Sequence, residues 1–510
     1  MENKEETKDV DTMTILHLPS HVLARVLNFL PIKSLCMFDS VVTCRGSRHH
    51  YLQALSYVDA TPLFTWHIAP MKFRGFVLWE NSLVWVFQRG LRLPIKIAFS
   101  PATDTILGLI KFCSDKAALS VLSVSVDYAT TATPSRLSNI SKFKSLQSLS
   151  MSCCNVSDNL LSQFKNLQEL LHLNLGSCSE LTDAGIVHIK ALTALQSLDL
   201  SSCQLSDISL SHLQPLPSLL HLNFSCASVT DQGLKYLAAF AKLKSIKLGT
   251  VHISDQGLEP LRGLKTLEGA DFTGCPGLDG SGLKHLRGTA MKILSLPVSV
   301  SDAGLSSLEG LPSLESLTLS SPNVTDSLFL HFSNFTCLKS LCLSSCPNIS
   351  GAGLVHIRCT DSLEELDLNS CRVSRDGFSF IERFPCLTKL GLGQSNNFQD
   401  DFLTDADLSL LHGLVSLQYL DLSSRCKLTD VGASSLSCLI DLRDLNLGYC
   451  QGDISKDAVM DLLQHLPRLE KLGVPESCEY EFQDIEGRGI ACYSDGRDNC
   501  SPMDSEDEWD

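Results

Sequence analysis

The chain has 510 residues, of which 44% are hydrophobic and 19% are charged, and its formal net charge is −16 at pH 7. This composition is typical of a folded, globular chain and excludes a largely disordered one. So acidic a chain lacks the basic surface that non-specific binding to nucleic acid or to anionic membranes requires, and we expect no partner of either kind.

The first segment, residues 1–13, is polar and acidic, and we expect it to be disordered. It lacks the basic start and the apolar core of a secretory signal, and no stretch of the sequence is apolar for long enough to span a membrane. We therefore expect a soluble protein of the cytoplasm, the nucleus or both. In such a reducing compartment the 21 cysteines should stay free thiols.

Residues 14–58 form the next predicted element. A Leu-Pro pair is followed by apolar residues at helical spacing, a second Leu-Pro pair and a second apolar helix from about Ile32. The layout resembles the F-box, a small helical module that binds the Skp-type adaptor of cullin-based ubiquitin ligases. The resemblance implies that the matching positions bind this adaptor, and they are Leu18, Pro19, Leu23, Val26, Leu27, Leu30, Pro31 and Leu35.

The match continues to Val41 and then ends. The family usually has a Cys-Lys-x-Trp-like sequence after this valine, whereas the chain continues with residues 42–46, Val-Thr-Cys-Arg-Gly, and has no tryptophan there. An amphipathic helical cap that shields the first repeat of a stacked domain therefore remains an alternative for this segment. Residues 59–94 are predicted to form a connector between this module and the domain that follows.

From residue 95 to residue 475 the sequence is repetitive. A Leu-x-x-Leu-x-Leu pattern returns at intervals of 23 to 30 residues, most often 24, which is the period of a leucine-rich repeat. Two degenerate copies, near Ile95 and at Leu119, precede fourteen clear ones. These open at Leu146, Leu170, Leu195, Leu219, Leu243, Leu267, Met291, Leu314, Leu338, Leu363, Leu387, Leu417, Leu442 and Leu469.

Each repeat predicts a strand, a turn and a helix. In residues 195–203 the alternation places Leu198 and Leu200 on one face of a short strand and Asp199 on the other. A Ser/Thr-Asp-x-Gly-Leu motif then follows in many copies, where the hydroxyl can cap a helix and the Asp favours the positive end of its dipole. Stacked repeats predict an α/β solenoid, with a curved parallel sheet inside and helices outside.

Cysteines recur eight residues after the repeat's opening leucine, at positions 154, 178, 203, 275, 346, 371 and 450. We predict that these thiols lie in the core, where cysteine acts as a small hydrophobic residue. The pattern resembles the cysteine-containing class of leucine-rich repeats, which is typical of intracellular F-box proteins. The resemblance covers about residues 140–475.

The other face of the strands should bind a protein. The predicted substrate-binding residues are Asp199, His221, Asn223, Lys247, Asp271, Glu365, Asp367, Tyr419, Asp421 and Asp444. With more acids than bases, this surface favours a partner with basic or polar features. The alternative is that Asp and Asn recur after the second strand leucine because the following turn requires them.

No motif predicts catalysis, a cofactor or a bound metal. Cys342 and Cys346 have the spacing of metal ligands, but the alternation of the strand places Cys342 on the exposed face and Cys346 in the interior. The long repeat from Leu387 contains a polar loop at residues 393–405, at one rim. Residues 476–510 carry twelve Asp or Glu against two arginines, a net charge of −10, and are predicted to be a disordered tail.

Together the two resemblances imply the substrate-recognition subunit of an SCF-type ubiquitin ligase. Its partners would be a Skp-type adaptor, a cullin scaffold and an unknown protein substrate, and the chain itself would not be an enzyme. A leucine-rich scaffold or inhibitor with a helical N-terminal cap, unrelated to ubiquitin, is the alternative.

Overall fold

The computed structural model describes residues 96–97, 122–128, 133–393, 403–424, 426–427, 429–450, 454–473 and 490–493. The predicted segments 1–13, 14–58 and 59–94, with all eight adaptor-binding positions, lie outside these residues, as does most of the loop at 393–405. The described part divides into two compact units. Unit 1 runs to Val229 and includes Ala239–Leu243, and unit 2 comprises Thr230–Ala238 and the residues from Lys244 on.

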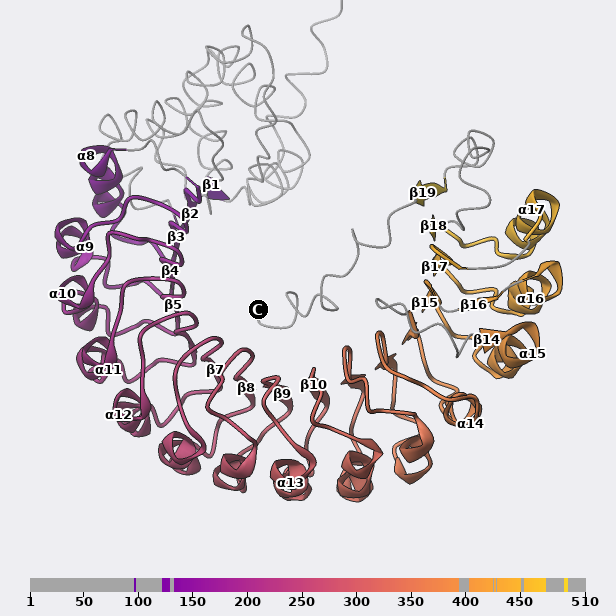
Figure 1. Ribbon diagram of the computed structural model, residues 1–510. Helices are drawn as coiled ribbons and strands as arrows, with labels where there is room; N and C mark the ends of the chain where they lie inside the picture. The colour runs from indigo at the N-terminus through magenta and orange to yellow at the C-terminus, as the bar shows by residue number, and fades with distance from the viewer. Residues whose placement is uncertain are drawn as a thin grey trace, which may run out of the picture. The chain divides into compact units, whose positions relative to one another are not determined.

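Unit 1 consists of parallel strands with helices along the opposite side (Figure 1). Its strands are β1 (Lys96–Ile97), β2 (Ser123–Ser125), β3 (Ser148–Ser150), β4 (His172–Asn174), β5 (Ser197–Asp199) and β6 (His221–Asn223). Its helices are α8 (Pro134–Leu137), η2 (Ser138–Lys142), α9 (Asp158–Phe164), α10 (Asp183–Ile186), η3 (Ile189–Ala191) and α11 (Asp207–Leu213), where η denotes a 3₁₀ helix.

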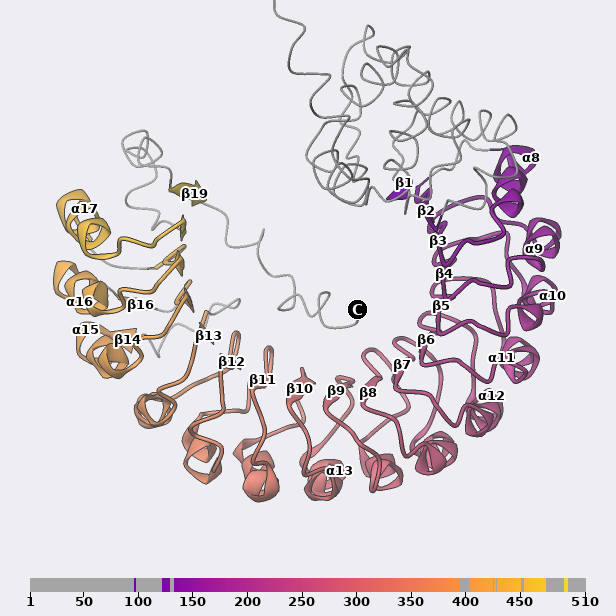
Figure 2. The ribbon, with the colours of Figure 1, turned by 180° about the vertical axis from the view of Figure 1, so that it is seen from behind.

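Unit 2 has the same two layers, with its strands on the inner side and its helices on the outer side (Figure 2). The strands are β7 (Ser245–Lys247), β8 (Gly269–Asp271), β9 (Ile293–Leu296), β10 (Ser316–Leu319), β11 (Ser340–Cys342), β12 (Glu365–Asp367), β13 (Lys389–Gly391), β15 (Tyr419–Asp421), β17 (Asp444–Asn446), β18 (Lys471–Gly473) and β19 (Ala491–Tyr493). A separate pair is formed by β14 (Leu403–Thr404) and β16 (Cys426–Lys427).

The helices of unit 2 are mostly short. They are α12 (Asp231–Leu234), η4 (Lys235–Ala239), η5 (Asp255–Gly263), η6 (Ser281–Leu286), α13 (Asp302–Leu305), η7 (Ser306–Gly310), η8 (Asp326–Asn334), η9 (Ala352–His356), α14 (Arg375–Ser379), η10 (Ile381–Arg383), α15 (Asp405–Leu408), η11 (Ser409–Gly413), α16 (Asp430–Ser435), η12 (Leu436–Cys438) and α17 (Lys456–His465). The predicted helix is present in these repeats, but in many of them part or all of it is a 3₁₀ helix. A 3₁₀ helix rises about 2.0 Å per residue, so it spans the outer side of a short repeat with fewer residues.

The core is a stack of leucines in strict register. Leu149, Leu173, Leu198 and Leu222 pair with one another across β3 to β6, and each is at most 2% exposed. The residues that open the fourteen predicted repeats are all buried. The prediction of a leucine-rich-repeat solenoid, with parallel strands and helices on the other side, is confirmed.

Both ends of the repeat domain add to the strand layer. The two degenerate N-terminal copies contribute β1 and β2, because Lys96 pairs with Ser123 and Ser123 pairs with Ser148. At the other end β19 pairs in parallel with β18, and Ala491 N–H donates to the Glu470 carbonyl at 2.9 Å. The expectation that residues 476–510 are entirely disordered is therefore wrong at 490–493. The high average charge of the tail obscured the short sequence Ile-Ala-Cys-Tyr at 490–493. This sequence pairs with the backbone N–H and C=O groups at the edge of β18.

Candidate interaction surface

Seven of the described strands end in a turn held by an Asp or Asn side chain. The side-chain oxygen accepts a hydrogen bond from the backbone N–H two residues later, at 2.8 to 3.1 Å. The residues that do this are Asn174, Asp199, Asn223, Asp271, Asp367, Asp421 and Asn446. These hydrogen bonds support the interpretation that the turn itself requires an Asp or Asn here. They account for five of the ten predicted positions without any partner: Asp199, Asn223, Asp271, Asp367 and Asp421.

After this turn the backbone bends inward through a residue in the left-handed region. Ser177 has φ 59° and Ser202 has φ 54°, and the cysteine that follows each of them is buried. A polar residue tolerates this conformation when local hydrogen bonds compensate its cost. The turn therefore directs one cysteine per repeat into the core.

The buried cysteines form a ladder of hydrogen bonds between repeats. Each thiol donates to a backbone carbonyl of the preceding repeat, as Cys178 Sγ does to Met151 O at 3.2 Å and Cys371 Sγ to Leu343 O at 3.0 Å. The same contact is made by Cys154, Cys203, Cys275, Cys346 and Cys450, at 3.0 to 3.7 Å. The prediction that these seven thiols belong to the core is confirmed.

Burial keeps these thiols neutral. It raises the pKa of Cys178 to about 12 and the pKa of Cys203 and Cys346 to about 11. A thiolate is the reactive form of cysteine, so thiols in this state are poor nucleophiles and poor metal ligands.

A second ladder joins the helix starts, and the sequence pattern did not reveal it. The Asp that follows the capping residue accepts two hydrogen bonds from the capping residue of the next repeat. One comes from the backbone N–H of that capping residue and the other from its hydroxyl. Asp158 accepts from Thr182 N at 2.9 Å and from Thr182 Oγ1 at 2.7 Å. The same pair recurs as Asp183 with Ser206, Asp231 with Ser254, Asp302 with Thr325, Asp326 with Ser350, Asp405 with Thr429 and Asp430 with Ser455.

This ladder explains the glycine of the Ser/Thr-Asp-x-Gly-Leu motif. A Cβ at Gly185 would clash with the Asp158 carboxylate, and a Cβ at Gly257 would clash with the Asp231 carboxylate. The predicted capping role is also confirmed at Thr182, whose hydroxyl accepts from Ala184 N at 3.3 Å. One motif thus caps its own helix and binds its neighbour.

In unit 1 the structure brings several predicted surface residues together. Asn223 Nδ2 donates to Asp199 Oδ2 at 3.1 Å, and Ser201 Oγ donates to the other oxygen of the same carboxylate at 2.7 Å. Both residues are half-buried, as is His221 beside Asn223. They form a polar surface in which two hydrogen bonds hold the Asp199 carboxylate in one orientation.

In unit 2 two predicted contact residues and one cysteine are buried. Asp367, Asp421 and Cys342 are 6%, 5% and 8% exposed, so the expectation that they present exposed side chains is wrong. Strand alternation identifies the face but not how closely neighbouring residues cover it. Asp367 accepts from Ser344 Oγ at 2.5 Å and lies 3.5 Å from the Cys342 thiol. Asp421 lies beside Gly393, where an added Cβ would be 2.8 Å from its Oδ1 atom.

The carboxyl of Asp421 is unusual. Burial raises its pKa, and the nearby Asp367 and Asp444 add to the shift, although two hydrogen bonds from Ser423 oppose it. A carboxylate in such a position costs free energy at neutral pH. Asp421 therefore acts as a turn residue that the fold tolerates at some cost.

Three more of the predicted residues of unit 2, Glu365, Tyr419 and Asp444, form an ordered row with Lys389 and Lys471, which the sequence analysis did not single out. Strand pairing places Lys389, Tyr419 and Asp444 side by side. Lys389 forms an ion pair with Glu365 at 2.5 Å, and Lys471 lies 3.9 Å from Asp444. Tyr419 is thus a half-buried aromatic side chain between two ion pairs, and this row of five residues is here called the Tyr419 row.

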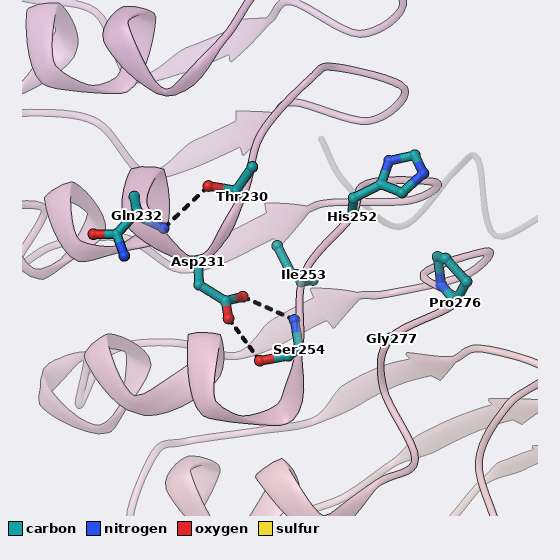
Figure 3. A pocket seen from close by; sticks show the side chains of 8 residues that line it. All are labelled: Thr230, Asp231, Gln232, His252, Ile253, Ser254, Pro276 and Gly277. Carbon is teal, nitrogen blue, oxygen red and sulfur yellow. Dashed lines mark hydrogen bonds between the residues drawn. The ribbon is translucent and has the colours of Figure 1, made fainter.

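A pocket of about 430 Å³ lies at the helix-start side of unit 2 (Figure 3). Several of its polar groups are already engaged: Asp231 accepts from Ser254 N and Oγ at 2.8 and 2.6 Å, and Thr230 Oγ1 accepts from Gln232 N at 3.2 Å. His252 and Pro276 form its outer wall. No hydroxyl among these described lining residues is hydrogen-bonded to a histidine, and the Asp231–Ser254 contact of the Asp ladder forms part of the wall, so we interpret the pocket as a gap between repeats.

Within the residues that the structure describes, no group of His, Cys, Asp and Glu side chains is arranged to hold a metal ion. None of the helices in that part of the chain is long and apolar enough to cross a membrane.

The sequence matches a family model described as a leucine-rich repeat region over residues 130–391, and a second leucine-rich-repeat model over residues 414–437. The chain is a leucine-rich-repeat protein. Proteins built from such repeats are typically interaction scaffolds without catalytic activity. A search of curated protein sequences finds no match.

Solved structures of low identity are similar to the chain. A leucine-rich-repeat protein of Leptospira interrogans is 16% identical, with 77% of this chain and 98% of that chain covered and a TM-score of 0.47. A chain of the yeast Rad7–Elc1 complex is 16% identical, with 76% and 92% covered and a TM-score of 0.45. An internalin of Listeria monocytogenes is 18% identical, with 74% and 95% covered and a TM-score of 0.42.

Proposed function

We propose that the chain is the substrate-recognition subunit of a cullin-RING ubiquitin ligase of the SCF type. In this proposal residues 14–58 bind the Skp-type adaptor, which carries the cullin scaffold, and the strand face of the repeats binds the protein to be ubiquitinated. The chain itself performs no chemistry. Its contribution is proximity, which raises the effective concentration of a substrate lysine near a charged conjugating enzyme.

The observation that carries this proposal is the cysteine ladder. Seven thiols recur at the one offset by which the sequence resembles the cysteine-containing repeat class, and each of them donates to the preceding repeat. This class is typical of F-box proteins, and the same chain has an F-box-like pattern from Leu18 to Val41. Two separate features of one sequence therefore support the same role.

For the substrate we propose two contact areas on the strand face, one in each unit. In unit 2 the Tyr419 row offers an aromatic side chain flanked by charge pairs, which is the composition of an energetic anchor in protein interfaces. In unit 1 His221, Asn223 and Asp199 offer fixed hydrogen-bonding groups. Lys247 and Asp271, which pair across β7 and β8, extend the face of unit 2.

The test of adaptor binding uses the full chain co-expressed with a Skp-type adaptor. We expect a stable complex in size-exclusion chromatography, and we expect Leu30→Asp to abolish it because a carboxylate replaces an apolar contact. The matched control is Leu330→Asp, since Leu330 is 57% exposed in the repeat domain and its replacement leaves the N-terminal segment intact. Absence of a complex, or a complex indifferent to Leu30→Asp, would refute the proposal.

The alternative is a leucine-rich scaffold or inhibitor in which residues 14–58 only cap the repeats. It is favoured by one observation, the absence of a tryptophan after Val41. Deletion of residues 1–60 distinguishes the two. A cap predicts loss of the cooperative thermal transition of the repeats, whereas an adaptor-binding module predicts that the repeats still fold and only adaptor binding is lost.

A further inference from the structure

Unit 2 has a basic patch that the proposed function does not use. It consists of four exposed side chains near the helix ends of two successive repeats: Arg262, Lys265, Lys284 and Arg287. In the part of the chain that the structure describes, none of these four forms an ion pair. Such a cluster is unexpected in a chain of net charge −16.

The four cations lie on, or just after, two adjacent helices. Helices η5 and η6 pack against each other, with Arg262 in the last turn of η5 and Arg287 immediately after η6. Lys284 precedes Arg287 by three residues, a spacing at which side chains of a 3₁₀ helix eclipse. The Lys265 ammonium extends to the next repeat, where it would lie 3.3 Å from a Cβ at Gly288.

Glycines keep this area open. The Arg287 side chain lies across Gly310, where an added Cβ would be 2.5 Å from Cγ and 2.8 Å from Nε. Gly263, beside Arg262, has no atom within 4 Å of an added Cβ. Arg262 and Arg287 are both exposed.

Two simpler explanations for the cations do not fit. Cations at helix ends can bind the last carbonyls, and Arg383 does so, with Nη1 3.0 Å from Leu354 O and Nη2 3.4 Å from Ile357 O. Neither Arg262 nor Arg287 makes such a bond through its side chain. Cations can also neutralise nearby acids, but Glu268 is already held between Lys244 at 3.3 Å and Lys292 at 3.1 Å.

We propose that the basic patch binds an acidic peptide segment of a partner protein. Guanidinium groups bind carboxylates through paired, charge-assisted hydrogen bonds, and four unpaired cations within two repeats fit a short run of Glu or Asp. A protein segment is favoured over nucleic acid because the patch has no aromatic side chain on which bases could stack. This surface is independent of adaptor binding and of the Tyr419 row.

The test measures fluorescence anisotropy of a labelled peptide of alternating Glu and Ser titrated with the full chain. We expect binding that weakens with salt. We expect Arg262→Glu with Arg287→Glu to lower the affinity about tenfold or more, because attraction becomes repulsion. The matched control is Lys165→Glu with Arg358→Glu, which makes the same change of charge at exposed positions elsewhere and should leave the affinity within about twofold.

Three results would overturn the proposal. The first is equal affinity of the patch variant and the unmodified chain, and the second is equal binding of a peptide with Gln in place of Glu. The third is tighter binding of a single-stranded oligonucleotide than of the acidic peptide.

A chain ending at residue 493 provides a further check. If only this shortened chain binds the peptide, the acidic C-terminal tail itself occupies the patch, and the proposal of a partner segment is wrong.

Discussion

In many repeats the two sides are joined to the neighbouring repeat by different polar groups. At the strand ends the link is a neutral thiol, such as Cys178, which is fully buried and donates to a carbonyl. At the helix starts the link is a carboxylate, such as Asp158, which is half-buried and accepts from an N–H and a hydroxyl. Burial therefore selects the chemistry, because a charged group in the deep position would lose its hydration.

Asp421 shows what happens when this separation is violated. It is a carboxylate at 5% exposure on the strand side, and its pKa is raised mainly by burial. Asn446, in the next repeat, makes the same turn contact without a charge, at 3.0 Å from Gly448 N. The comparison of the two sides can be tested with substitutions on each.

The largest effect is expected on the helix side. Gly185→Ala should destabilise the protein by about 2–3 kcal/mol, because the added methyl group displaces the Asp158 carboxylate from Thr182. Chemical denaturation monitored by circular dichroism measures the change. Gly263→Ala is the control, since nothing lies within 4 Å of its added Cβ. Equal stability of the two variants would show that the carboxylate ladder contributes little.

On the strand side Cys178→Ala should cost about 1–2 kcal/mol, since it leaves the Met151 carbonyl without its donor and a small void beside it. The effect should also depend on pH. Burial raises the pKa of the thiol from 9.0 to about 12, so the unfolded chain ionises first and stability falls as the pH rises from 9 toward 12. The Ala variant should lose less stability over this range in thermal melts. A parallel loss in both proteins would contradict the assigned role of the thiol.

A smaller change of opposite sign is expected for Asp421→Asn. The amide still accepts from Ser423 N–H, and it removes a buried charge, so we expect a gain of about 1 kcal/mol or less. The pKa of Asp421 is higher in the folded chain than its value of 3.8 in the unfolded chain. The stability that the protonated Asp421 contributes is therefore fully present below pH 3.8 and is lost as the pH rises through the pKa of the folded state. The gain should therefore vanish at low pH. Asp271→Asn, at the same turn position but half-exposed, is the control and should be neutral.

The smallest effect is expected for the exposed charges. A hydrogen bond from Lys292 is the main cause that lowers the pKa of Glu268, with Lys244 assisting. These side chains are 32% to 47% exposed, so Glu268→Gln should cost only about 0.5 kcal/mol, and less at high salt. Denaturation at two salt concentrations measures the difference. Glu259→Gln, on η5, serves as the unpaired reference.

The repeat itself was predictable from the sequence for a physical reason. Its leucines must alternate on short strands, and its cysteines must return at one offset, because every repeat occupies the same environment. The predicted register of Leu149, Leu173, Leu198 and Leu222 and the burial of Cys154 and Cys178 follow directly from that regularity. The turn role of Asp199 was likewise one of two interpretations that the pattern allowed.

Contacts between different repeats were not predictable in the same way. The Ser/Thr-Asp-x-Gly-Leu motif indicated a capped helix, but only the stacked structure shows that Asp158 binds Thr182 and requires Gly185. Strand β19 was missed because the average charge of residues 476–510 concealed a short apolar sequence whose partner, β18, lies next to it only in the folded chain.

By itself the sequence determined the period, the identity of the core residues and the face on which the polar strand residues lie, because these depend on local alternation. Only the tertiary structure decided which of those polar residues remain available. Among the strand residues, Asp367 and Asp421 are buried, whereas Tyr419 is half-buried between two ion pairs. On the helix side, Arg262 and Arg287 are exposed and form no ion pair with the described residues. Exposure and pairing depend on how adjacent repeats pack, and the order of residues within one repeat does not contain that information.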